Sequence, residues 1–278
     1  MAQESAHPVL IIKPANRSAD LGLAEIWQYR HLFYWLTWRD IKVRYKHTVM
    51  GMLWALFQPL ALATVLTFAV GLIARFPTSD IPLPVFLLAG IAVWSMFAAI
   101  VHLMSVSLQA NSALISKVYF PRLTVVLSSA GIPLMDFLVM YGLLLVACVV
   151  FGATISPLFP LSILFALLGA VLGIGVGLWL ATLNTKYPDS RFMVPVILQA
   201  GMFASPVIYS LDLVPAAWRP IVAINPMVGV IEGFRFCVFG QGMLDWRMTA
   251  VSVIAAGIVL ITGLWRFQRD EKLLIDAL

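Results

Sequence analysis

The strongest constraint on this chain is a long stretch without charge, since no Asp, Glu, Lys or Arg occurs between Asp136 and Lys186. A soluble fold of this size needs charged side chains over its whole surface. A bilayer core is about 30 Å thick and takes roughly 20 apolar helical residues per crossing. Across the chain, 62% of the 278 residues are hydrophobic and 11% charged, against about 45–50% and 25% in soluble domains. The chain is therefore predicted to be an integral membrane protein.

Six apolar segments are predicted to span the membrane as helices. Their approximate ranges are 49–74, 84–108, 124–151, 161–183, 192–210 and 248–265. Within an all-α membrane fold, we expect a flexible lead-in at 1–20, an amphipathic interfacial segment at 21–48, a membrane domain at 49–268 and a tail at 269–278. The apolar runs 221–224 and 226–231 are too short to cross, so they predict re-entrant half-helices between the fifth and sixth spans.

The Lys and Arg residues are distributed unevenly between the two sides of this topology. Of the 18, 14 lie in the N-terminal segment, the connectors 109–123 and 184–191, and the C-terminal tail. Cytoplasmic loops carry the excess of positive charge in membrane proteins. Both termini are therefore predicted to be cytoplasmic, and the net charge of +5 reflects topology rather than nucleic-acid binding.

The segment before the first span combines an apolar-aromatic face with basic residues. The apolar stripe recurs at helical spacing at Tyr34, Trp38, Ile41, Tyr45 and Val49. The basic residues are Arg39, Lys42, Arg44 and Lys46. This pattern predicts a helix in the headgroup layer. The segment could serve as a membrane anchor, a site for a lipid phosphate or diphosphate, or a docking surface for a cytoplasmic partner.

Sequence motifs for nucleotide binding or catalysis are missing from the chain. No segment matches the phosphate-binding pattern G-x-x-x-x-G-K-[ST], nor H-E-x-x-H, C-x-x-C or G-x-S-x-G. The sequence therefore predicts no catalytic residue, no metal site, and no ATP hydrolysis through such a loop.

Asp136 is the one charged residue predicted to lie deep in the membrane. Carboxylates at that depth are costly and usually functional, so a proton relay or an ion site is one hypothesis. A buried hydrogen bond between helices, or a position nearer the interface, is the other. In the fourth span, Gly169, Gly173 and Gly177 recur at four-residue spacing and predict close packing between helices.

Several motifs together resemble the type-2 ABC exporter permeases. They are Arg39-Asp40-Ile41-Lys42-Val43-Arg44-Tyr45-Lys46, Gly51-Met52-Leu53-Trp54, Gln58-Pro59, Asn184-Thr185-Lys186-Tyr187-Pro188-Asp189, Ser205-Pro206-Val207-Ile208-Tyr209, Asn225-Pro226-Met227 and Glu232-Gly233-Phe234-Arg235. They occur in the order found in that family, over about residues 25–270. Within the family, the sequence is most similar to bacterial O-antigen and related polysaccharide exporters.

The resemblance implies a homodimer that works with two copies of a separate ATPase subunit, which would bind ATP and Mg²⁺. This chain itself would hold no cofactor and would not be an enzyme. The implied substrate is a polysaccharide on a lipid carrier, commonly undecaprenyl diphosphate, moved across the bacterial inner membrane. Two alternatives are a type-2 permease for drugs or other lipids, and an intramembrane enzyme acting on polyprenyl phosphates.

The resemblance also implies roles for particular residues. The lipid diphosphate would bind Arg39, Lys42, Arg44 and Lys46. The channel would be lined by the first and fifth spans, through Trp54, Phe57, Gln58, Phe68, Gln199, Phe203 and Tyr209, although packing is an equal alternative for these aromatics. Coupling to the ATPase would involve Asn111, Ser116, Lys117, Lys186, Tyr187, Asp189 and Arg191, in connectors that could also be simple turns. A periplasmic gate would contain Asn225, Pro226, Glu232 and Arg235, and the last two could form an ion pair.

Overall fold

The computed structural model describes residues 27–46, 51–74, 81–117, 121–241 and 244–270, and every regular element in these ranges is helical. The main helices are α2 (Arg30–Lys46), α3 (Gly51–Phe68), α4 (Leu83–Ala110), α6 (Arg122–Ser128), α7 (Gly131–Val150), α8 (Ser162–Lys186), α9 (Ser190–Ala204), α11 (Pro226–Phe239) and α12 (Trp246–Asp270). The short ones are the π-helix η1 (Ala69–Ala74), α5 (Ser112–Ile115), η2 (Phe159–Leu161), η3 (Leu211–Leu213) and α10 (Arg219–Val222). The predicted lead-in 1–20 and residues 271–278 of the predicted tail lie outside the described ranges.

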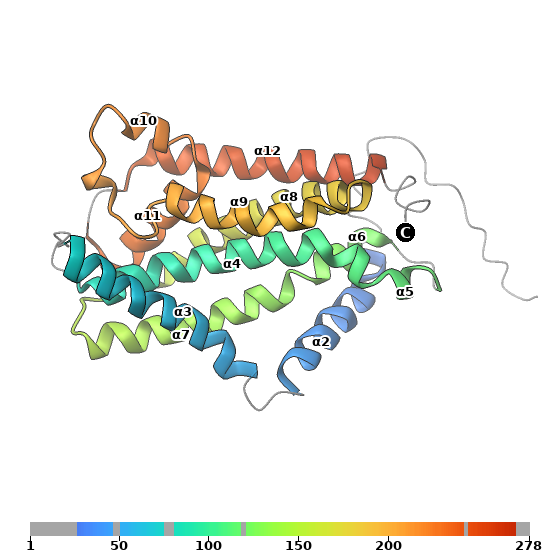
Figure 1. Cartoon of the computed structure of the whole chain (residues 1–278), viewed down its shortest axis with the longest axis horizontal. Helices are drawn as coiled ribbons and strands as arrows, with labels where there is room; N and C mark the ends of the chain where they lie inside the picture. The colour runs from blue at the N-terminus through green and yellow to red at the C-terminus, as the bar shows by residue number, and fades with distance from the viewer. Residues whose placement is uncertain (1–26, 47–50, 75–80, 118–120, 242–243, 271–278) are drawn as a thin grey trace, which may run out of the picture.

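The long helices form a bundle with two distinct ends (Figure 1). One end carries α5, α6 and the last turn of α12, and the other carries α10 and the end of α11, where the backbone N–H of Ser156 donates to the carbonyl oxygen of Val238. Four stretches are long and apolar enough to cross a membrane, namely Leu83–Ala110, Arg122–Val150, Phe159–Lys186 and Trp246–Asp270. Leu56–Gly71 and Ser190–Ala204 are shorter apolar helices. The all-helical prediction is confirmed for the described residues, while the count of six crossings and the side of the termini stay predictions.

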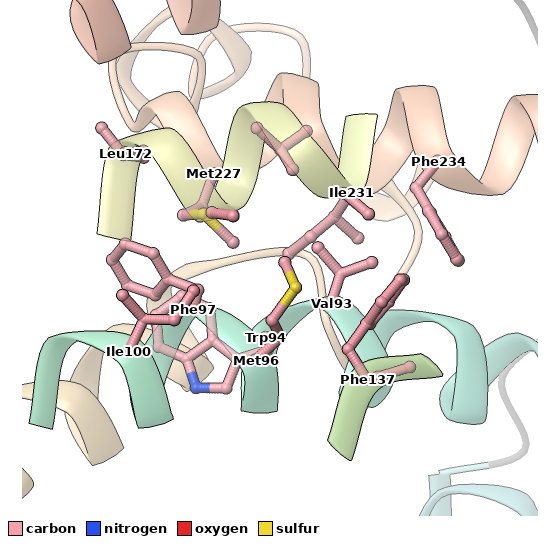
Figure 2. Packing of buried hydrophobic residues seen from close by; sticks show 14 of the residues in the cluster. Val93, Trp94, Met96, Phe97, Ile100, Phe137, Leu172, Met227, Ile231 and Phe234 are labelled. Carbon is pink, nitrogen blue, oxygen red and sulfur yellow. The ribbon is translucent and has the colours of Figure 1, made fainter. Parts of the chain in front are cut away.

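α4 is the central helix of the bundle, because α3, α7, α8, α9 and α11 all pack against it. Figure 2 shows side chains from α4, such as Val93 and Met96, next to Met227 and Ile231 of α11. The ring of Phe137 on α7 meets that of Phe234 edge to face, with centroids 6.2 Å apart. Burial of α4 on several sides fixes the helices that carry the polar groups discussed below.

The glycines of α8 let it approach two neighbouring helices closely. A Cβ on Gly173 would lie 3.3 Å from Ile100 of α4, and one on Gly177 would lie 2.8 Å from the Cβ of Met104. On another side of α8, a Cβ on Gly175 would lie 2.7 Å from the backbone nitrogen of Leu260 in α12. Side chains at these positions would force the helices apart. The prediction that these glycines serve packing is confirmed.

Two helices end or break inside a predicted span. The fifth span was expected to continue to residue 210, but α9 ends at Ala204, and Ser205 has the extended dihedral angles φ −104° and ψ 152°. Ser205 precedes Pro206, and a residue before proline is disfavoured from the helical region. The third span is divided into α6 and α7 by the turn at Ser129 and Ala130.

Candidate functional site

Arg235 on α11 is a buried cation that joins three segments of the chain. Its side chain is 5% exposed. Its Nη1 donates to the carbonyl oxygen of Pro206 at 2.6 Å, and Nη2 donates to that of Val207 at 2.7 Å. Nη1 also lies 3.3 Å from Oε1 of Glu232. We call this group of four residues the Arg235 clamp.

Helix α4 packs against the Arg235 clamp. The guanidinium carbon of Arg235 lies 3.6 Å from the ring centroid of Phe86 on α4, in a cation–π contact. One turn further along α4, a Cβ on Gly90 would lie 2.5 Å from Nη2 of Arg235 and 2.8 Å from the carbonyl oxygen of Val207. Glycine is therefore required at residue 90 for the guanidinium and the 205–209 segment to approach the helix together.

The start of α11 is fixed to the same segment by side-chain hydrogen bonds. Asn225 caps the helix, since its Oδ1 accepts from the backbone N–H of Met227 at 3.0 Å. Its Nδ2 donates to Oγ of Ser205 at 2.8 Å. The carbonyl oxygen of Pro226 accepts from Oγ of Ser252 on α12 at 2.6 Å. The end of α9, the start of α11 and α12 are therefore linked by polar contacts.

Two of the four residues predicted to form a gate, Asn225 and Arg235, thus contact the segment 205–209. The predicted pairing of Glu232 with Arg235 is confirmed by their ion pair. Arg235 binds the segment directly and Asn225 binds it through Ser205. The predicted opening of this region as a gate is not tested by these contacts.

A second polar network lies at the opposite end of the bundle, where helices α4 and α8 finish. Nε2 of Gln109 donates to the carbonyl oxygen of Asn184 at 2.9 Å. The buried side chain of Asn184 donates through Nδ2 to the carbonyl oxygen of Ser105 at 2.9 Å. Its Oδ1 accepts from Oγ of Ser190, the first residue of α9. From α2, Nη2 of Arg39 donates to Oδ1 of Asn111 at 2.9 Å.

These contacts define the connector network, which consists of Arg39, Ser105, Gln109, Asn111, Asn184 and Ser190. It joins α2, the end of α4, the end of α8 and the start of α9. Hydrogen bonds therefore link the two connectors to α9 and α2, so a displacement of either connector would also displace one of these helices.

The residues predicted to couple to an ATPase lie on or beside this network. Asn111 is part of it, while Ser116, Lys117, Lys186, Tyr187, Asp189 and Arg191 are exposed. Lys186 lies 5.4 Å from the ring centroid of Tyr187, and the guanidinium of Arg191 lies 4.8 Å from that of Phe192. The second connector thus presents cations and aromatic rings at its surface, and its coupling role stays a prediction.

The basic residues of α2 make intramolecular contacts. Besides Asn111, Arg39 pairs with Asp40 at 2.7 Å, and the ammonium of Lys42 lies 5.4 Å from the ring centroid of Trp38. The side chain of Lys46 lies outside the described atoms. Binding of a lipid diphosphate by Arg39, Lys42, Arg44 and Lys46 is a prediction that these contacts do not test.

Asp136, whose role the sequence left open, holds α2 against α7. Its Oδ2 lies 2.8 Å from Nη2 of Arg44, and its Oδ1 accepts a hydrogen bond from the hydroxyl of Tyr45. Burial, followed by the hydrogen bond to Asp136, raises the pKa of Tyr45 to about 12. The hydroxyl therefore stays protonated at neutral pH and remains a donor. These contacts agree with the helix-packing hypothesis for Asp136.

The residues predicted to line a channel lie mainly on exposed surfaces of α3 and α9. The exposed fractions are 59% for Phe57, 62% for Phe68 and 56% for Phe203, and Gln58 and Gln199 are exposed as well. Both helices pack on α4 and lie on the face toward the viewer in Figure 1. Tyr209 follows α9 rather than belonging to it, and is half-buried. The side chain of Trp54 lies outside the described atoms.

Sequence reasoning missed several residues of these networks. Gln109 and Asn184 directly follow two predicted spans that end on the same side of the membrane. Their carboxamide groups were therefore expected at the same depth, and a hydrogen bond between the two helix ends could have been predicted. No comparable signal existed for Phe86 and Gly90, because their contact with Arg235 depends on how α11 docks against α4.

The sequence matches the ABC-2 type transporter family over residues 31–239. It is 28% identical over 235 residues to the O-antigen export system permease protein RfbA of Klebsiella pneumoniae, covering 84% of this chain and 90% of that protein. It is 26% identical over 257 residues to the protein of the same name from Myxococcus xanthus, covering 89% and 96%. Identity to the polysialic acid transport protein KpsM of Escherichia coli is 26% over 241 residues, covering 86% and 93%. The chain is thus a multi-pass membrane protein and belongs to the ABC-2 type transporter family.

Proposed function

We propose that this chain is the transmembrane permease subunit of an ATP-driven exporter that moves a lipid-linked polysaccharide across the bacterial inner membrane. The observation that carries the proposal is the likeness to permeases named for O-antigen export and for polysialic acid transport, over 84–89% of this chain. These relatives are named for the export of O antigen and for the transport of polysialic acid. We infer that the substrate here is a polysaccharide, carried on a lipid such as undecaprenyl diphosphate.

The energy would come from two copies of a separate ATPase subunit that binds ATP and Mg²⁺. The sequence contains no phosphate-binding loop of the G-x-x-x-x-G-K-[ST] type. The connector network would lie on the cytoplasmic side, because the connectors and α2 carry much of the chain's positive charge. Exposed groups such as Lys117 and Tyr187 would contact the ATPase. Asn184 and Arg39 would pass its movement to α9 and α2.

The exposed surfaces of α3 and α9 support a homodimer with a channel between the two copies. Only Val194 and Met202 are buried among the 15 residues of α9. Aromatic rings such as Phe57 and Phe203 can stack on the apolar faces of sugars, and neighbouring glutamines can bond hydroxyl groups. The polymer would leave near the Arg235 clamp, which would keep the 205–209 segment in place at the periplasmic end.

Purification of this chain with a candidate ATPase subunit from the same organism tests the proposal. We expect a stable complex of two permease and two ATPase chains, whose rate of ATP hydrolysis rises when lipid-linked polymer is added. Undecaprenyl diphosphate without sugar is the control and should stimulate hydrolysis less. If drugs or ordinary phospholipids stimulate hydrolysis and the lipid-linked polymer does not, the substrate class is wrong.

A further inference from the structure

A cavity of about 180 Å³, with apolar walls and four polar side chains, lies where α2, α3, α4 and α7 meet. Each helix contributes one polar side chain to its lining, namely Arg44, Gln58, Ser95 and Asp136. Ser95 is near the middle of the 28-residue α4, so the cavity reaches well inside an apolar span. Polar groups at such a depth are costly unless they are satisfied and are usually functional.

The two charges in this cavity neutralise each other. Arg44 and Asp136 form an ion pair of 2.8 Å, and Tyr45 donates a second hydrogen bond to the carboxylate. An anion such as a diphosphate would meet the negative charge of Asp136, and a cation would meet Arg44. Like charges at close range oppose binding, so the cavity disfavours ions of either sign.

Gln58 and Ser95 provide the remaining hydrogen-bonding capacity. Within the part of the chain that the structure describes, no hydrogen bond reaches the amide of Gln58 or the hydroxyl of Ser95. An amide and a hydroxyl both donate and accept. Leu62, Met96 and Met140 add apolar walls. The cavity therefore combines donors, acceptors and apolar surface without net charge.

We propose that this cavity binds an uncharged sugar ring of the exported polymer, in a subsite formed by Gln58, Ser95 and the paired Arg44 and Asp136. A sugar ring offers hydroxyl groups that donate and accept at once, and C–H faces that pack on apolar side chains. This proposal rests on the proposed function. It also places Arg44, which the resemblance assigned to the lipid diphosphate, in a site for an uncharged sugar.

The test measures binding of short, uncharged oligosaccharides, released from the source organism's polymer and freed of carrier, to the full-length permease in lipid nanodiscs. We expect Gln58→Leu to weaken binding about tenfold and Ser95→Ala about fivefold, because each removes hydrogen bonds to the sugar. Thr67→Val and Ser107→Ala are matched controls on the same helices. Their hydroxyl groups bond the carbonyl oxygens of Ala63 at 2.7 Å and Met104 at 2.8 Å, so oligosaccharide binding should stay unchanged.

A second measurement does not depend on the loss of a hydrogen bond. A Ser95→Cys variant would react with a small methanethiosulfonate reagent, while the native Cys148 and Cys237 are buried. We expect the oligosaccharide to slow this modification, and sugar-free undecaprenyl diphosphate to leave its rate unchanged.

Different failures have different meanings. If the wild-type protein binds the oligosaccharide, but Gln58→Leu and Ser95→Ala bind it equally well and the thiol of the Ser95→Cys variant is not protected, the cavity assignment is wrong and the exporter proposal survives. If the variants weaken binding of undecaprenyl diphosphate instead, the cavity is an anion site. If lipid-linked polymer fails to stimulate the ATPase complex and no oligosaccharide binds, the exporter proposal itself fails.

Discussion

Arg235 and Arg39 make similar contacts at opposite ends of the molecule, yet they differ in how far they are exposed to solvent. Each pairs with an acidic residue on its own helix and donates to an oxygen on another segment. The side chain of Arg235 is 5% exposed, whereas that of Arg39 is 43% exposed. A buried charge cannot leave its partners without a large desolvation cost, while an exposed charge can exchange them for water. The Arg235 clamp is therefore suited to fixing a segment, and the Arg39 contact to being remade.

Asn184 shows that the connector network is not uniformly weak. Its side chain is buried, and it bonds Ser105 and Ser190. The network thus has a fixed centre, at Asn184, and an adjustable edge, at Arg39 and Asn111. A movement of the connectors would then be transmitted to α9 through Asn184, while Arg39 of α2 could exchange its hydrogen-bond partners.

The largest expected effect is that of Arg235→Met. The substitution leaves Glu232 and the carbonyl groups of Pro206 and Val207 without their buried partner, so we expect a loss of about 3–5 kcal/mol in the free energy of unfolding. Unfolding in mixed detergent micelles measures this loss. Arg219→Met is the matched control, because Arg219 also donates to two carbonyl groups, of Val214 and Asp212, but is exposed. Equal losses of unfolding free energy in the two variants would mean that burial does not make the contacts of Arg235 stronger than those of Arg219.

Gly90→Ala addresses the same clamp from the side of α4. The new methyl group would lie 2.5 Å from Nη2 of Arg235, and such overpacking costs about 1–3 kcal/mol. Gly142→Ala is the control, since a Cβ there meets nothing within 4 Å. It should be neutral or stabilising by up to about 1 kcal/mol. If Gly90→Ala is as harmless as this control, the clamp is not tightly packed.

Asn184→Ala tests the centre of the connector network. We expect a loss of about 1–3 kcal/mol in stability, because the carbonyl oxygen of the buried Ser105 loses its donor and the hydroxyl of Ser190 loses one of its two acceptors. The ATPase complex should still assemble, but hydrolysis should respond less to the polymer. Thr185→Val is the control, since the hydroxyl of this buried threonine donates to the carbonyl oxygen of Ala181 in its own helix. A normal polymer response in Asn184→Ala would show that the network does not carry the coupling.

The smallest effect is expected at the edge of the network. A double-mutant cycle of Arg39→Met and Asn111→Ala should give a coupling energy of about 0.2–1 kcal/mol, as for other exposed charged pairs. High salt should reduce this coupling energy further. A coupling energy of several kcal/mol would mean that the contact of Arg39 with Asn111 is as strong as those of the Arg235 clamp.

Local features of the sequence were sufficient for the helices and for one ion pair. Apolar runs and their periodicity predicted an all-α fold, and the three-residue spacing predicted the contact of Glu232 with Arg235. The early end of α9 was also readable, because Ser205 precedes a proline. These predictions succeeded or could have succeeded because their causes lie within a few residues of chain.

The contacts of Asp136 and Asn184 needed the folded chain. Asp136 meets Tyr45 from 91 positions away, and Asn184 meets the carbonyl group of Ser105 from 79 positions away. Such pairs depend on which helix faces dock together, and several arrangements of apolar helices have similar local patterns. Sequence reasoning therefore named Asp136 as unusual without identifying its partners.

The most direct test of polysaccharide export by this chain is made in cells that lack its gene. If the chain exports a lipid-linked polysaccharide, the deletion strain should lose surface polymer and accumulate carrier-linked polymer on the cytoplasmic side of the inner membrane. Wild-type protein should restore surface polymer, and the Arg235→Met variant should restore less of it. Unchanged surface polymer in the deletion strain, with no accumulation inside, would mean that this chain does not export the polymer.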